Sequence, residues 1–185
     1  MASCGDSAFF DVVEESKSTE IKTLTYYTVE GVGTFTGTYT TTMLGSEGDF
    51  KLEYSYTRIA TLEDLNASGV TIEGNIATVS GTVNYKAGKY STDGLTWFEQ
   101  APAVTENQPK LNLDSKKLGD YVINEDKTSI TATLTAAEAA EVLGVAIDAS
   151  SDVVITVSTN GTSLNRLTVT YTNGTTKVRI DTSYS

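Results

Sequence analysis

Hydrophobic and polar residues alternate at every second position over most of this chain. The alternation is clearest in residues 50–57, where Phe, Leu and Tyr side chains share one face of an extended segment and Lys, Glu, Ser and Thr share the other. A period of two is typical of a β-strand with one buried and one solvated face. The pattern predicts nine strands, over residues 22–29, 33–43, 50–60, 76–85, 89–98, 129–134, 153–158, 164–171 and 176–182.

Short turns join these segments. Three dipeptides can supply the positive φ angles of a tight hairpin turn, namely Asp93-Gly94, Asn160-Gly161 and Asn173-Gly174. Strands that are consecutive in the sequence are therefore expected to pair antiparallel. Gly37 and Gly81 lie inside predicted strands, and we expect them to mark bends or bulges that make the sheet curl.

Two helices interrupt the strand pattern. Residues 7–18 carry Phe and Val on one side, and Ser7 is the candidate N-cap. Thr135 and Glu138 have the spacing of a capping box, good helix formers fill residues 136–143, and Gly144 stands where a C-terminal cap belongs. Residues 101–110 contain both prolines and no periodicity, so a loop or crossover is predicted there.

Together these elements predict a mainly β protein. The expected architecture is a large curved antiparallel meander, an unclosed half-barrel, with two short helices at the N-terminus and near residues 135–144. A length of 185 residues is that of one ordinary domain. Residues 7–185 are therefore expected to form a single β-rich domain, with residues 1–6 as a tether.

The composition argues against most active-site chemistry. Lys and Arg number 13 and Asp and Glu 24, and the resulting net charge of −11 repels the phosphates of nucleic acids. Histidine is absent, which removes the commonest general base and metal ligand. The carboxylate pairs are chain neighbours whose side chains point apart, and neither a phosphate-binding glycine loop nor a calcium loop occurs. We therefore expect no enzyme activity, no metal and no cofactor.

Cys4 is the single cysteine, so it cannot form an internal disulfide. Ala2, Ser3 and Cys4 resemble the end of a bacterial lipobox, in which small residues precede a cysteine that is lipidated. On this interpretation Cys4 is a lipid anchor, and the protein is extracytoplasmic and attached to a bacterial membrane only through that lipid. A free thiol near the chain terminus is the alternative.

The apolar face of the predicted sheet is rich in aromatic residues, and Tyr alone numbers 10. Two short helices offer little to cover it. An imperfectly covered face would leave an apolar pocket, the usual form of a small-ligand site. The candidate lining is Phe35, Tyr39, Tyr54, Tyr56 and Trp97. The competing interpretation is that these side chains fill an ordinary core.

The order of the elements resembles that of the LolA-like and LprG-like bacterial lipoproteins. A helix follows a lipobox-like Cys4, a long antiparallel meander with aromatic alternation leads to a Tyr90 to Trp97 passage, and a short helix precedes the closing strands. The resemblance covers roughly the whole mature chain. It implies a non-enzymatic half-barrel that holds a lipid, an acyl chain or another apolar ligand on the concave face of its sheet. The alternative is a β-sandwich that acts as a cell-surface interaction or adhesion module, with a protein partner and no small-molecule ligand.

Overall fold

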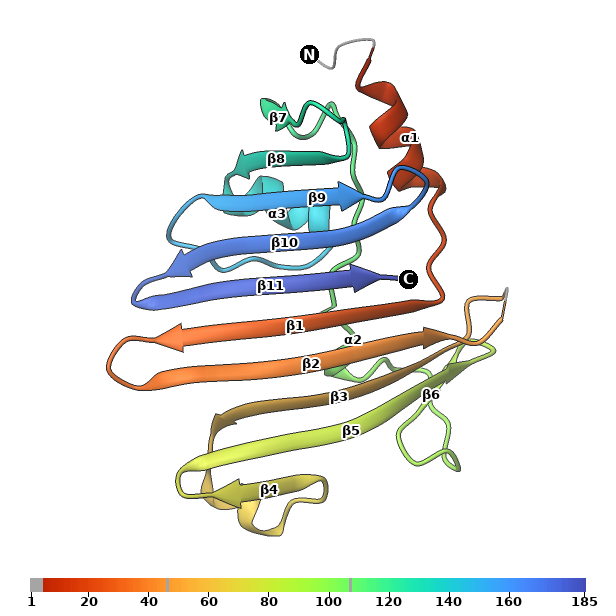
Figure 1. The fold of residues 1–185 in the computed structure, drawn as a ribbon. Coiled ribbons are helices and arrows are strands. Elements are labelled where there is room, and N and C mark those ends of the chain that lie inside the picture. Colours follow the sequence, from red (N-terminus) through yellow and green to blue (C-terminus); the bar gives the residue numbers. More distant parts are fainter. Residues whose placement is uncertain (1–4, 46, 107) are drawn as a thin grey trace.

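A computed structural model describes residues 5–45, 47–106 and 108–185. The strands form one antiparallel sheet of eleven strands (Figure 1). They are β1 (Glu20–Val29), β2 (Gly33–Met43), β3 (Phe50–Ile59), β4 (Val70–Glu73), β5 (Ile76–Lys86), β6 (Lys89–Ser91), β7 (Tyr121–Ile123), β8 (Ser129–Leu134), β9 (Val153–Thr159), β10 (Leu164–Asn173) and β11 (Thr176–Tyr184). Ten follow the order β4-β5-β3-β2-β1-β11-β10-β9-β8-β7, and β6 pairs with the same edge of β5 as β4 does.

The sheet is open, because β4 and β7 end the strand order without pairing with each other. The helices are α1 (Ser7–Glu15), the 3₁₀ helix η1 (Leu62–Asn66), α2 (Ala103–Glu106) and α3 (Ala136–Leu143). The prediction of an unclosed antiparallel meander with a helix at the N-terminus and another near residues 135–144 is confirmed. The β-sandwich alternative is wrong as a description of the fold, since the described residues form one sheet and not two.

Strand register places apolar and aromatic residues on one face, which we call the inner face. Tyr27 of β1 pairs with Phe35 of β2, and Val169 of β10 pairs with Ile180 of β11. Because side chains alternate along a strand, the neighbouring positions form the outer face, where Thr, Ser and charged residues dominate. The two ends of the chain meet in the middle of the sheet, where β1 lies between β2 and β11.

The core lies under only one half of the inner face. The buried cluster joins α1 and α3 to strands β8 to β11, and its fully buried members include Leu143, Ile155 and Leu167. In the other half, Leu52 and Val83 are buried between β3 and β5, but most of the aromatic side chains around them are only partly covered. The helices therefore cover the inner face unevenly.

Several predicted elements differ in extent. The predicted strand 89–98 is wrong beyond Ser91, because the chain leaves the sheet there and only Phe98 returns to bridge Tyr90. The short edge strands β4 and β7 were not predicted, since three or four residues give too little alternation to recognise. Helix α1 ends at Glu15 rather than at residue 18, and the residue before its first turn is Asp6 rather than Ser7. Cys4 and the lipobox-like residues lie outside the described residues.

Candidate ligand-binding site

Helix α1 is fastened to the inner face at both of its ends. Phe9 is 2% exposed within the core, and the ring of Phe10 meets Tyr121 of β7 edge-on, with centroids 5.5 Å apart. At the other end, Ser16 Oγ accepts a hydrogen bond of 2.9 Å from the backbone N–H of Leu164, at the start of β10. The helix is therefore a fixed wall over β8 to β10.

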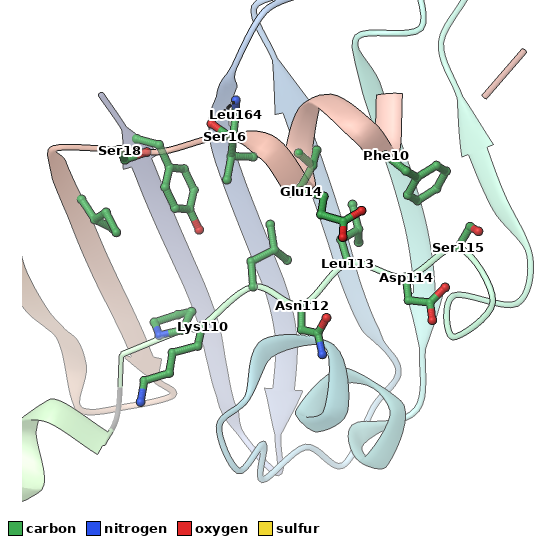
Figure 2. Close-up of a pocket in the computed structure, with 15 residues that line it drawn as sticks. Phe10, Glu14, Ser16, Ser18, Lys110, Asn112, Leu113, Asp114, Ser115 and Leu164 are labelled. Atoms are coloured by element: carbon green, nitrogen blue, oxygen red, sulfur yellow. Dashed lines mark hydrogen bonds between the residues drawn. The ribbon is translucent and has the colours of Figure 1, made fainter. Parts of the chain in front are cut away.

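A second wall is formed by residues 109–115, which we call the strap. The strap crosses the inner face between α1 and α3 (Figure 2). The backbone N–H of Lys110 donates to the carbonyl of Leu143 at 2.7 Å, and that of Asn112 donates to the carbonyl of Val142 at 2.8 Å. These carbonyls are free to accept because α3 ends at Gly144, in the left-handed conformation, and the last turn of a helix has unpaired carbonyls. The end of α3 thus holds the strap in place.

Between α1 and the strap lies a groove of about 700 Å³, which we call the α1 groove (Figure 2). Its apolar lining comes from α1, β1, β10, β11 and the strap, and it includes Phe10, Val13, Ile21, Pro109, Leu111, Leu113, Leu164 and the ring of Tyr184. Three charged residues also line it, namely Glu14, Lys110 and Asp114. A volume of this size is within the usual range for small-molecule sites, and the mixture of apolar and charged lining is suited to an amphipathic ligand.

The ring of Tyr184, near the end of β11, also lines the α1 groove. Its hydroxyl oxygen is buried and has no hydrogen-bond partner among the described residues. Burial raises the pKa of this hydroxyl above its ordinary value, because the phenolate form would lose its hydration. Tyr184 is therefore a neutral and unpaired polar group beneath the groove.

Three of the predicted lining residues lie together on the less covered half of the inner face. The rings of Tyr39, Tyr54 and Tyr56 form what we call the tyrosine row. Their planes are nearly parallel, at 16° for Tyr39 and Tyr56 and 22° for Tyr54 and Tyr56, with centroids 6.4 and 6.2 Å apart. Phe35 lies on the same face of β2, two positions before Gly37, while Tyr39 lies two positions after it. All four side chains are partly exposed, and burial raises the pKa of Tyr39 to about 12.

Two glycines allow the tyrosine rings to lie against the sheet. A Cβ atom on Gly37 would come within 2.8 Å of the Tyr39 ring, and one on Gly81 would come within 2.5 Å of the Tyr54 hydroxyl. The cross-strand register continues without a shift through both glycines. The expected bulges are therefore wrong, and the glycines instead make room for aromatic rings from neighbouring positions.

A smaller hollow of about 250 Å³ lies between the α1 groove and the tyrosine row. Tyr27, Tyr39 and Tyr171 line it together with the loop that follows α3. Pro109 of the strap lines both this hollow and the α1 groove. The two hollows therefore adjoin at Pro109, and a surface of mixed apolar and polar side chains continues from the groove to Tyr39.

Trp97 does not belong to this surface. It is 38% exposed and lines a separate hollow of about 380 Å³ with Asn84 and Lys86, at the end of the sheet where β5 turns into β6. The structure thus brings together Tyr39, Tyr54 and Tyr56, with Phe35 on the same face, and places Trp97 apart from them.

The α1 groove itself was not predicted from the sequence. Its lining includes two leucines of the strap, Leu111 and Leu113, which lie in a stretch without clear periodicity. The alternation of Leu111, Leu113 and the polar residues between them is the one signal that this segment has an apolar side. Nothing in the sequence indicates which part of the sheet that side covers.

In the described part of the chain, no cluster of three or more Asp, Glu or Cys side chains could hold a metal ion. Within the same residues, none of the helices is long and apolar enough to cross a membrane. Comparison with known proteins adds no identification, since no protein-family model matches the chain and no curated protein matches it either.

Proposed function

We propose that this protein binds an apolar chain, a lipid or acyl chain, on the inner face of its open sheet and that it does so without catalysis. The observation that carries the proposal is the α1 groove, a space of about 700 Å³ whose lining combines apolar side chains with polar and charged ones, as an amphipathic acyl ligand requires. Beyond Pro109, a smaller hollow leads to Tyr39, the nearest ring of the tyrosine row. A long ligand would lie in the groove and continue toward Tyr39.

The energetics favour long chains over short ones. Each methylene that moves from water into the groove contributes about 0.8 kcal/mol, so ten contribute roughly 8 kcal/mol. Association itself costs about 4–15 kcal/mol. Short chains should therefore bind weakly, and affinity should rise about fourfold with each added methylene until the groove is filled.

The proposal includes a membrane anchor and a cellular location. Cys4, outside the described residues, would carry the lipid, and the domain would lie outside the cytoplasmic membrane of a bacterium. The lipobox-like Ala2, Ser3 and Cys4 support this part, as does the resemblance to LolA-like and LprG-like lipoproteins. Metabolic labelling with a radioactive fatty acid, in bacteria that express the protein or its Cys4→Ser variant, tests it.

The binding itself is tested with the purified protein. Native mass spectrometry followed by solvent extraction would detect a copurifying acyl species, and titration with saturated fatty acids of increasing length would measure affinity. Ser18 lines the groove and makes no hydrogen bond to other described residues. Ser18→Trp should obstruct part of the groove and weaken binding, while Ser18→Ala should bind as the wild type does.

The outcomes separate the groove from the tyrosine row. Binding that survives Ser18→Trp but is lost in Tyr56→Ala would place the ligand on the row and refute the groove as the site. Failure of every fatty acid to bind the wild-type protein would refute the proposed function. Circular dichroism of each variant checks that loss of binding does not reflect loss of fold.

A further inference from the structure

The hollow beside Trp97 is built by three turns that meet at one end of the sheet. Leu44 and Asp49 come from the connection between β2 and β3, Tyr85 and Lys86 come from the end of β5, and Trp97 comes from the loop after β6. The hollow has a volume of about 380 Å³. It is separate from the α1 groove and shares no lining residue with it.

The loop that carries Trp97 is held by a dense set of hydrogen bonds. Asp93 Oδ1 accepts from the backbone N–H groups of Leu95 at 2.8 Å and Thr96 at 2.7 Å, and from Ser91 Oγ at 3.1 Å. Those backbone hydrogen bonds hold the pKa of Asp93 at about 2, well below its ordinary value. The loop is thus fixed by a carboxylate that stays charged at neutral pH.

The same loop is closed at its base. Tyr90 and Phe98 exchange two backbone hydrogen bonds, of 2.8 and 2.9 Å, so that residues 91–97 form a loop with its ends tied together. Ser91, at the start of the loop, is fully buried, and its Oγ accepts from the N–H of Gly94 at 2.8 Å. The backbone that carries Trp97 is therefore held in place by hydrogen bonds, while the Trp97 side chain itself is 38% exposed.

The opposite wall is also fixed. The turn between β5 and β6 places Ala87 and Gly88 at positive φ, 50° and 81°, as a two-residue hairpin turn requires. Asp49 Oδ1 accepts from the N–H of Ala87 at 3.1 Å, which ties the β2–β3 connection to this hairpin. Asp49 Oδ2 stays available to a ligand, because no described residue donates a hydrogen bond to it.

Two further polar groups of the hollow have no protein partner. The side-chain amide of Asn84 and the ammonium of Lys86 make no hydrogen bond or ion pair with any described residue. The hollow therefore combines one partly exposed indole, one amide, one ammonium and one carboxylate oxygen. Among the residues that line the hollow, Asp49 and Lys86 carry one charge each, of opposite sign, on a chain whose net charge is −11.

From this arrangement we infer that the hollow binds a neutral sugar residue, such as a terminal hexose of a glycan. A pyranose ring has an apolar C–H face that packs on an aromatic ring, and a rim of hydroxyl groups that both donate and accept. The Trp97 indole fits the face, while Asn84, Lys86 and Asp49 fit the rim. A lipid chain would leave these polar groups unpaired, and a phosphorylated ligand would meet the Asp49 carboxylate and the acidic surface.

Trp97 is the only tryptophan of the chain, so its fluorescence reports directly on the hollow. Titration with a panel of neutral monosaccharides and disaccharides, up to about 50 mM, covers the millimolar affinities that a single sugar site gives. We expect at least one sugar to shift or quench the emission with saturation. No change with any sugar of the panel would overturn the inference, as would saturation by charged ligands, such as nucleotides or amino acids, in place of sugars.

A pair of variants assigns the binding to the hollow. Asn84→Leu removes the amide at similar size and should weaken the sugar at least tenfold. Leu95→Ala is the matched control, because Leu95 is 86% exposed on the same loop but does not line the hollow. Equal affinity in Asn84→Leu and the wild type would show that the sugar lies elsewhere and would overturn the proposal. This test is independent of the α1 groove. Ser18→Trp adds a second tryptophan, so its sugar affinity is measured by calorimetry instead of fluorescence, and it should equal that of the wild type.

Discussion

Removing one buried oxygen atom should make this protein more stable. The hydroxyl of Tyr184 is buried without a hydrogen-bond partner among the described residues. In the unfolded chain the same hydroxyl is hydrated, and leaving a buried polar group unsatisfied costs about 1–3 kcal/mol. Tyr184→Phe deletes the hydroxyl and keeps the ring, so the free energy of unfolding should rise by about 1–2 kcal/mol. For a domain of this size that is an increase in Tm of roughly 2–8 °C.

Tyr121→Phe is the matched control, because it deletes a tyrosine hydroxyl that does make a hydrogen bond. The Tyr121 hydroxyl donates to Asp6 Oδ2 at 3.1 Å, and Asp6 is 7% exposed. Loss of a hydrogen bond to a charged group costs about 1.5–3 kcal/mol. The two variants should therefore shift the urea midpoint in opposite directions at pH 7, Tyr184→Phe upward and Tyr121→Phe downward.

The pH dependence of Tyr184→Phe gives a second check. The pKa of Tyr184 in the folded protein is raised above its ordinary value of 10. Below pH 10 the hydroxyl is neutral in both states, so the stability of the wild type does not change through this group. Above pH 10 the hydroxyl ionises in the unfolded chain first, and the wild type loses stability as the pH rises toward the pKa of the folded protein. The stability gap between Tyr184→Phe and the wild type should widen above pH 10. A Tyr184→Phe protein that unfolds at lower urea than the wild type would refute the reasoning.

Three further substitutions test other parts of the structure. Asp64→Asn breaks a bidentate pair with Arg58, whose two hydrogen bonds are 2.6 and 2.7 Å long, and should lower the urea midpoint at pH 7. The hydrogen bonds from Arg58 lower the pKa of Asp64, so the difference in midpoint between variant and wild type should shrink as the pH falls below 3.8. Gly37→Ala should cost about 1–3 kcal/mol in urea unfolding, since its Cβ would meet the Tyr39 ring at 2.8 Å. Thr135→Ala removes the capping box of α3 and should cost about 1 kcal/mol, with faster hydrogen exchange in the strap that α3 holds.

Each of these has an outcome that would contradict it. If the urea midpoint of Asp64→Asn stayed equally far below that of the wild type in acid, the loss of stability would not come from the ion pair with Arg58. The Cβ of Gly81→Ala would meet the hydroxyl end of the Tyr54 ring alone, whereas that of Gly37→Ala would also meet the Thr25 hydroxyl at 2.6 Å. A larger loss of stability in Gly81→Ala than in Gly37→Ala would contradict this reasoning. If hydrogen exchange at the Lys110 and Asn112 amides were unchanged in Thr135→Ala, the stability of the strap would not depend on that of α3.

The long strands and α3 could be predicted because their signals are local. Strand β2 matches its predicted range, and the capping box of α3 is visible as two residues three positions apart. The Asp93-Gly94 dipeptide indicates a turn, and Gly94 does have a positive φ of 76°, yet no hairpin forms there. The reason is that the Asp93 side chain captures two backbone N–H groups that a strand would have donated to its neighbour. A side chain that competes with the sheet in this way is not visible in an alternating pattern.

The α1 groove could not be predicted, because it follows from the order of the strands rather than from any single segment. Strand β6 lies at one edge of the sheet and β7 lies at the other. The connection between them, residues 92–120, must therefore cross the sheet from edge to edge, and its middle part is the strap. A crossing chain covers only a narrow band of the inner face, so space remains on both sides of it. On one side that space is the α1 groove, and on the other it is the hollow that leads to the tyrosine row.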